Sequence, residues 1–152
     1  MAKTKELREQ LKIKISAAAA SAVQPAVPVT TATTATTATE TTSQEVVTPE
    51  VYYAYAKPSA AAPYLIFNVE EITREDGRIT CELEVNCLDY ARNTERCENI
   101  ADAVEKALDH TVTITENIEF HIYANRRNNV SSNDVQIVRR RLTFDLYLYE
   151  RT

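Results

Sequence analysis

Apolar residues recur along this chain at two different periods, and each period predicts a different kind of element. Near the N-terminus they recur at spacings of three and four, which predicts an amphipathic helix over about residues 3–20. The apolar face of this helix comprises Leu7, Leu11, Ile15 and Ala18. Its other face is largely basic, and two prolines at positions 25 and 28 prevent the helix from continuing.

Strict alternation of apolar and polar residues begins later and predicts strands with one buried face. The clearest strand is residues 78–88, in which polar residues alternate with Ile79, Cys81, Leu83, Val85 and Cys87. Alternation and β-branched or aromatic composition predict four more strands, over residues 51–56, 64–72, 118–122 and 142–148. The pair Asp76-Gly77 holds the only glycine of the chain and favours a two-residue hairpin turn.

The period returns to that of a helix in residues 93–110. One face of this segment is lined by Cys97, Ile100, Ala101, Val104, Ala107 and Leu108. Asn93 or Thr94 is the expected N-cap, because either side chain can accept a hydrogen bond from the first free N–H groups. Acidic residues follow in the first turn, where the helix dipole favours them.

The connection between the last two strands is the least regular part of the pattern. Residues 125–134 are almost wholly polar, which predicts a long turn. Val135 and Ile137 are out of phase with the apolar residues of 142–148, so a β-bulge is expected near residues 138–141.

This order of elements predicts an α+β fold in a single domain over residues 1–152. We expect one mostly antiparallel sheet of about five strands, with two helices packed on one face. A Thr/Ala-rich insert, residues 23–50, separates the first helix from the first strand.

The insert includes the repeat "TTATTATTATE" at residues 30–40, and no Lys or Arg lies between Ser16 and Ala56. Threonine disfavours helix and tolerates extended structure, and residues 30–45 contain no large apolar side chain. The insert is therefore a flexible or extended arm, or a long hairpin that needs a partner to become ordered. An unstructured surface loop is the alternative.

Composition excludes several classes of protein. The formal net charge of −5 argues against general nucleic-acid binding, which needs a basic face, although DNA can pass an acidic wall without adhering. Cys81, Cys87 and Cys97 have neither disulfide nor zinc spacing, and we expect them to be buried thiols in a reducing cytoplasm. No stretch is long and apolar enough to span a membrane, and "SAAAASAV" at residues 16–23 continues a helix rather than forming a signal peptide.

Candidate chemistry is sparse. The chain has no glycine-rich phosphate loop, and His110 and His121 have no cysteine or carboxylate at ligand spacing, so each is expected to be a surface or structural residue. The carboxylate pairs Glu70-Glu71 and Glu82/Glu84 read as solvated charges on a strand rather than as acid–base catalysts. The sequence therefore predicts no catalytic residue, no metal site and no cofactor.

Tyrosine and arginine supply the candidate interface residues. Exposed tyrosines on strands suit protein interfaces, although ordinary cross-strand packing explains them equally well. The arginines can form ion pairs between subunits, remain solvated or contact a DNA backbone; the first two readings are preferred in an acidic chain. The candidates are Tyr52, Tyr53, Tyr55, Arg126, Arg127, Arg139, Arg141, Tyr147 and Tyr149.

In the order of its elements the chain resembles a family of phage proteins. A basic helix precedes "VYYAYAKPSAAAPYLIFNV" at residues 51–69, then "CLDYARNTERCENIADAVEKAL" at 87–108 and "RRRLTFDLYLYE" at 139–150. This order is similar to that of the tail-terminator (tail-completion, head–tail joining) proteins of long-tailed bacteriophages. The resemblance covers about residues 3–20 and 51–150, and it rests on pattern rather than on a catalytic motif.

The resemblance implies structural work in a virion assembled in the host bacterial cytoplasm. Such proteins form a ring, usually a hexamer, on the last ring of the tail tube, where they end its polymerisation and bind the head–tail connector or neck proteins. DNA passes through the lumen without specific binding, and no membrane takes part. Alternatives are another neck or tail ring component, a non-viral cytoplasmic binding module and, least favoured, a small enzyme.

The insert is where the chain departs from this family. As a random chain it spans roughly 30 Å, which is enough to reach a neighbouring subunit. We expect it to be an inter-subunit arm, with Thr30, Thr34, Thr37 and Glu40 as candidate contact residues.

Overall fold

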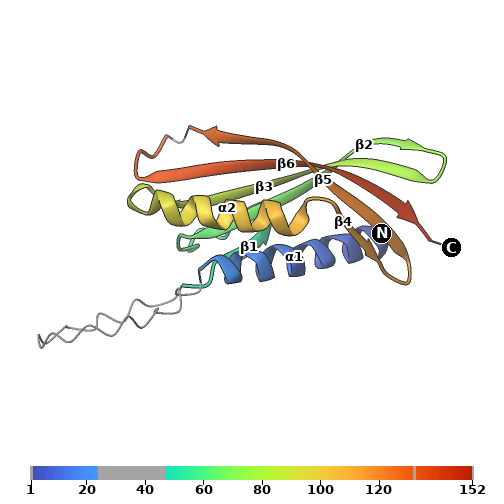
Figure 1. The fold of residues 1–152 in the computed structure, drawn as a ribbon, viewed down its shortest axis with the longest axis horizontal. Coiled ribbons are helices and arrows are strands. Elements are labelled where there is room, and N and C mark those ends of the chain that lie inside the picture. The colour runs from blue at the N-terminus through green and yellow to red at the C-terminus, as the bar shows by residue number, and fades with distance from the viewer. Residues whose placement is uncertain (1, 24–46, 132, 152) are drawn as a thin grey trace, which may run out of the picture.

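The chain folds into a six-stranded sheet with both α-helices on one of its faces (Figure 1). The computed structural model describes residues 2–23, 47–131 and 133–151. The helices are α1 (Ala2–Ala22) and α2 (Thr94–Leu108), and a 3-10 turn (Ala91–Asn93) precedes α2. The strands are β1 (Glu50–Tyr53), β2 (Tyr64–Glu75), β3 (Arg78–Tyr90), β4 (Thr111–Ile114), β5 (Ile118–Val130) and β6 (Ile137–Glu150).

The strands lie in the order β1-β2-β3-β6-β5-β4. Only β1 and β2 pair in parallel, and the other neighbours pair antiparallel. The predicted α+β class, with a mostly antiparallel sheet and two helices on one face, is confirmed. The strand count is six rather than five, because the four residues of β4 are too short a run for alternation to be recognised.

The hydrophobic core lies between the sheet and the two helices. The strands contribute three fully buried phenylalanines, Phe67, Phe120 and Phe144, and α1 and α2 cover them with the apolar faces that the sequence predicts. The buried helix residues include Leu7, Leu11, Ile15, Cys97, Ile100, Val104 and Leu108. Each large side chain buried in this way contributes about 1.5–3 kcal/mol to the free energy of unfolding.

The turn between β2 and β3 follows the sequence prediction. Asp76 and Gly77 both have positive φ angles, 43° and 80°, and they connect Glu75 to Arg78, which pair directly. Positive φ at both central residues gives the twist that suits a two-residue hairpin. Since Gly77 has no Cβ, it adopts this conformation without strain.

The predicted connection between β5 and β6 is partly wrong. Residues 125–130 belong to β5 rather than to a turn, although they are mostly polar. The expected bulge near residues 138–141 is also wrong, because β6 pairs with β3 without interruption. The register shift lies instead in β5, between Ala124 and Arg126. It reverses which residues of β5 face the helices.

Two other boundaries differ from the prediction. The first strand ends at Tyr53 rather than at residue 56, because Ala54 has a positive φ of 65° and turns the chain. Asn93 holds the N-cap position of α2 but makes no capping hydrogen bond through its side chain. The Thr94 hydroxyl instead donates to the Ala91 carbonyl.

Polar contacts fix both ends of the helix layer to the sheet. Asp89 is fully buried at the end of β3, and both of its oxygens accept from Arg96 of α2 at 2.7 Å. At the other end, Asn117 donates to Glu6 of α1 at 3.0 Å. The start of α1 therefore lies beside the β4–β5 turn.

The Thr/Ala-rich insert falls mostly on residues 24–46, outside the described residues, and so do Thr30, Thr34, Thr37 and Glu40. Within residues 2–23, 47–131 and 133–151, no helix is long and apolar enough to cross a membrane.

Burial predicts that the thiols of the native protein are unreactive. It raises the pKa of Cys81 and of Cys97 to about 11 and raises the pKa of Cys87 further. A thiol of pKa about 11 is ionised in about one molecule in a thousand at pH 8, whereas an ordinary cysteine is ionised in about one in four. We expect alkylation at pH 8 to be at least roughly 100-fold slower in native than in urea-unfolded protein. Stoichiometric labelling of one native thiol at the unfolded rate would contradict its buried position.

Candidate functional site

The sheet face opposite the helices is not covered by any described element. On this face the cross-strand pairs of β2, β3, β6 and β5 form rows, and three kinds of side chain occupy successive rows. Aromatic residues lie at the end nearest β4, carboxylates lie in the middle, and arginines lie toward the β5–β6 turn. A broad surface with this zoning is the candidate functional site.

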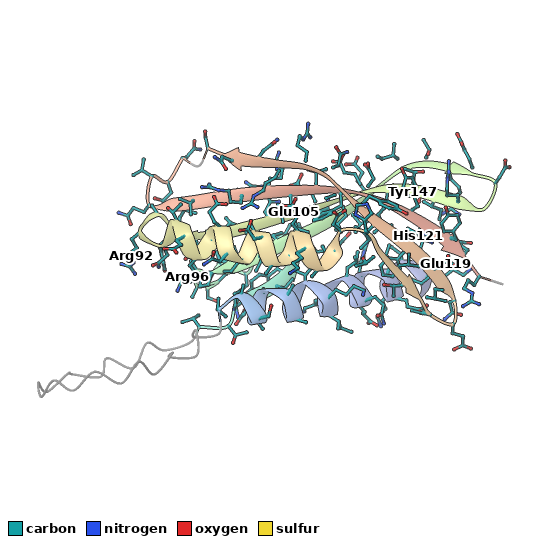
Figure 2. The ribbon with its side chains drawn as sticks, viewed as in Figure 1. Arg92, Arg96, Glu105, Glu119, His121 and Tyr147 are labelled. Atoms are coloured by element: carbon teal, nitrogen blue, oxygen red, sulfur yellow. The ribbon has the colours of Figure 1, made fainter. Side chains whose placement is uncertain are left out.

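The aromatic end, here called the aromatic patch, comprises His121, Tyr123, Tyr147 and Tyr149. The rings of Tyr123 and Tyr147 are 6.0 Å apart, and those of His121 and Tyr149 are 5.4 Å apart. The guanidinium of Arg78 lies 5.7 Å from the Tyr147 ring centre. Figure 2 shows Tyr147, His121 and Glu119 together at this end, far from Arg92 and Arg96 at the start of α2.

Tyr147 and Tyr149 alternate with the buried Leu146 and Leu148, so they lie on the face of β6 that points away from the helices. His121 and Tyr123 were not among the sequence candidates, although both lie on the polar phase of β5. Their position beside the tyrosines of β6 depends on strand order, which alternation alone does not reveal.

A row of three carboxylates crosses the middle of the exposed face. Glu70 of β2 pairs with Glu82 of β3, and Glu82 pairs with Asp145 of β6. Asp145 accepts a hydrogen bond from Asn125 at 3.0 Å, whereas Glu70 and Glu82 have no cation or donor among the described residues. Like charges placed directly opposite on neighbouring strands destabilise a sheet. The folded chain therefore keeps a repulsive arrangement at the centre of its exposed surface.

The arginine candidates are placed unequally. On the exposed face, Arg139 donates to Asn86 at 2.8 Å and Arg141 lies 3.4 Å from Glu84. Arg126 is exposed and makes no ion pair with any described residue.

Arg127 faces the helices instead. It forms ion pairs with Glu98, Asp102 and Glu105 of α2. Arg140 joins the same group through Glu98. This network holds the outer half of the β5–β6 hairpin against α2.

The tyrosines near β1 lie at the opposite edge of the sheet. Tyr53 packs edge-on against Phe67, and Arg8 of α1 covers its ring at 4.1 Å. Tyr52 donates a hydrogen bond to Glu50, and Tyr55 is 81% exposed. The structure therefore brings Tyr147 and Tyr149 together but keeps Tyr52, Tyr53 and Tyr55 apart from them.

The described residues offer little for catalysis. No group of three or more His, Cys, Asp or Glu side chains among them could hold a metal ion. His121 contacts Glu119 at 2.8 Å and His110 contacts Asp109 at 2.9 Å, which leaves each as a paired surface residue. The arrangement is suited to binding a macromolecular surface.

Comparison with solved structures shows a shared fold at low sequence identity. A chain from the virion of a native gene transfer agent (GTA) particle is 17% identical with a TM-score of 0.53, and the match covers 66% of this chain and 78% of that chain. A second solved structure, whose name describes no function, is 9% identical with a TM-score of 0.56 and coverage of 69% and 82%. No protein-family model and no curated protein matches the sequence.

The neighbouring arginines Arg126 and Arg127 give a matched test of the β5 bulge. We expect Arg127→Ala to lower the free energy of unfolding by about 1 kcal/mol, because Asp102 and Glu105 lose their cation and Glu98 keeps only Arg140. Arg126→Ala is expected to change it by less than about 0.5 kcal/mol. Urea denaturation measures both, and about 1 M NaCl should shrink the Arg127 effect. A larger loss of stability in Arg126→Ala than in Arg127→Ala would mean that β5 has no register shift in solution.

The carboxylate row predicts a stabilising substitution. Glu82→Gln removes the central charge of the row and is expected to raise the free energy of unfolding by about 0.5 kcal/mol. The control is Glu84→Gln in the same strand, where the native carboxylate accepts from Asn86 at 2.6 Å and pairs with Arg141, so stability should fall. Denaturation of dilute protein checks both signs. A loss of stability in Glu82→Gln would show that the row is not repulsive.

Proposed function

We propose that this protein is a structural component of a virion, and more specifically a terminator of the tail tube. In this role, copies form a hexameric ring at the head-proximal end of a phage tail. The ring ends polymerisation of the tail-tube protein and provides the surface on which the head–tail connector or neck proteins dock. The protein acts by binding, and no catalytic step or cofactor is part of the proposal.

The observation that carries the proposal is the uncovered sheet face with its aromatic patch. Tyrosine and histidine rings desolvate a large area at a small cost in side-chain entropy, and aromatic residues are enriched at protein interfaces. The neighbouring row of three carboxylates, which has no cation among the described residues, costs stability in the isolated chain, and basic side chains of a partner would relieve it.

Two independent similarities support a virion rather than another binding role. The order of elements resembles that of tail-terminator proteins, and the fold is shared with a chain of a gene transfer agent virion. The proposed partners are further copies of this chain, the tail-tube protein and the connector or neck proteins. The acidic net charge of −5 suits a ring through which DNA passes without specific binding.

The two edges of the sheet are unlike surfaces. One edge presents β1 (EVYY) and the other presents β4 (TVTI), so a contact between β1 of one copy and β4 of the next joins two different surfaces. Unlike surfaces that meet head to tail generate a closed ring when the rotation between copies closes.

The aromatic patch provides the mutational test of this function. We expect the double substitution Tyr147→Ser and Tyr149→Ser to weaken binding to purified tail tubes by at least roughly tenfold, because a buried aromatic contact often contributes 2 kcal/mol or more. Tyr90→Ser, on the same face at the opposite end of β3, serves as the control and should have a smaller effect. Light scattering of the protein alone and with tubes measures ring formation, and electron microscopy measures capped ends. Unchanged capping by a folded double variant would reject the patch as the docking surface.

Particles assembled without this protein test the terminator role itself. A terminator predicts tails of uncontrolled length, whereas a joining protein predicts tails of normal length beside full, unattached heads. Normal virions at full yield would reject both roles.

A further inference from the structure

The two edges of the sheet differ in how well they are protected from further pairing. The β1 edge carries a charged cluster, in which Lys57 lies 3.2 Å from Glu50, and charge on an edge strand discourages pairing. The β4 edge has neither charge nor proline. The side chains of Val112 and Ile114 lie on the sheet face opposite the helices and are 52% and 59% exposed.

The backbone of β4 is also open for pairing. Thr115 N–H donates to the Ile118 carbonyl at 2.8 Å, which fixes the alternation of the ladder between β4 and β5. By that alternation, Thr111 and Thr113 direct their N–H and C=O groups toward β5, whereas Val112 and Ile114 direct theirs outward. The residues with exposed apolar side chains thus also present donors and acceptors that no described residue outside their own strand engages.

This edge is fixed in place and sharply bounded. The β4–β5 turn is held by the Arg151 N–H, which donates to the Asn117 carbonyl at 2.9 Å. Just beyond β4, the Asp109 carboxylate accepts the outward Ala124 N–H at 2.7 Å and closes the edge of β5 there. The Thr113 hydroxyl, on the side of β4 that faces the helices, is buried with no hydrogen-bond partner among the described residues.

We infer that β4 accepts an extended strand from the Thr/Ala-rich segment, residues 24–46, of a second copy of this chain. The inference rests on the proposed ring and names the contact that links its neighbours. Threonine tolerates strand conformation, its methyl group can pack against Val112 and Ile114, and the segment carries no Lys or Arg that would have to be placed at an apolar edge. Main-chain hydrogen bonds to an open edge then supply the affinity.

The position of the segment favours a neighbouring copy over the chain's own β4. The start of α1 lies beside the β4–β5 turn, and Val23 follows the far end of α1, about 25 Å away. The elements that flank the segment, α1 and β1, place its two ends beside β1, at the edge of the sheet opposite β4 (Figure 1). A head-to-tail repeat brings that edge close to the β4 edge of the next copy, and an excursion through residues 24–46 extends up to about 35 Å.

Cross-linking between single-cysteine variants tests the inference in the full chain. Thr34→Cys protein is mixed with Ile114→Cys protein, assembled on tail tubes and treated with a short bismaleimide; the native thiols are buried and do not compete. We expect a covalent dimer containing one chain of each variant. Ile72→Cys replaces Ile114→Cys in the control, because Ile72 is equally exposed at 57% but lies on β2, and it should give roughly tenfold less product.

Each other product overturns the inference in a distinguishable way. Dimers of Ile114→Cys with itself would mean that β4 pairs with β4. An intrachain link in a Thr34→Cys/Ile114→Cys double variant would place the segment on its own β4. Rings that cap tubes without any of these links would leave the proposed function intact and remove the strand contact. Protein that neither multimerises nor binds tubes would reject the proposed function together with the inference.

A backbone substitution separates main-chain pairing from side-chain contact. Val112→Pro removes an outward N–H, and proline is tolerated on an edge strand where the N–H faces solvent. We expect the Tm of the monomer to be unchanged and the Thr34–Ile114 cross-link to fall several-fold. Val112→Thr, which keeps the N–H, is the control and should retain most of the product. Full cross-linking in folded Val112→Pro would show that no strand is added at β4.

Discussion

The structure depends on one constraint: the sheet has a single apolar face, and two short helices must cover all of it. Phe67, Phe120 and Phe144 lie on strands that are far apart in sequence, yet all three are fully buried beneath α1 and α2. The described residues hold one α-helix before the sheet and one within it, and neither covers the second face. That face therefore stays open, and its side chains are selected for solubility or for a partner rather than for the core.

The arrangement of charges on the exposed face does not favour the stability of the single chain. Glu82 lies between Glu70 and Asp145 where a lysine would be favourable, while several arginines lie only a few rows away. A sequence free to optimise the monomer would place opposite charges in these pairs. Retention of a locally unfavourable arrangement beside clustered aromatic rings is typical of a surface whose partner is absent.

The sequence predicts much of the fold but little of the placement of its candidate site. Both helices, the strand from residue 78 and the Asp76-Gly77 turn follow from local pattern. The roles of Arg126 and Arg127 do not, because one extra residue at the β5 bulge exchanges which of them faces the helices. The phase of Phe120 and Ile122, extended without the bulge, would bury Arg126 and expose Arg127. The four residues of β4 are equally difficult to recognise, since four residues contain too few alternations to identify a strand.

The short strand β4 leaves one edge of the sheet less protected from pairing with another chain than the β1 edge. A parallel β1 with a charged pair beside it is a poor template for another chain, and α1 packs against it. An antiparallel β4 with outward Val112 and Ile114 is a good one, although its length limits how many residues can pair. Asp109 prevents the pairing from extending along β5, so the edge can accept a strand without becoming an open-ended aggregation site. In the ring that we propose, a protected β1 edge and a short, bounded opening at β4 would give the head-to-tail contacts a direction.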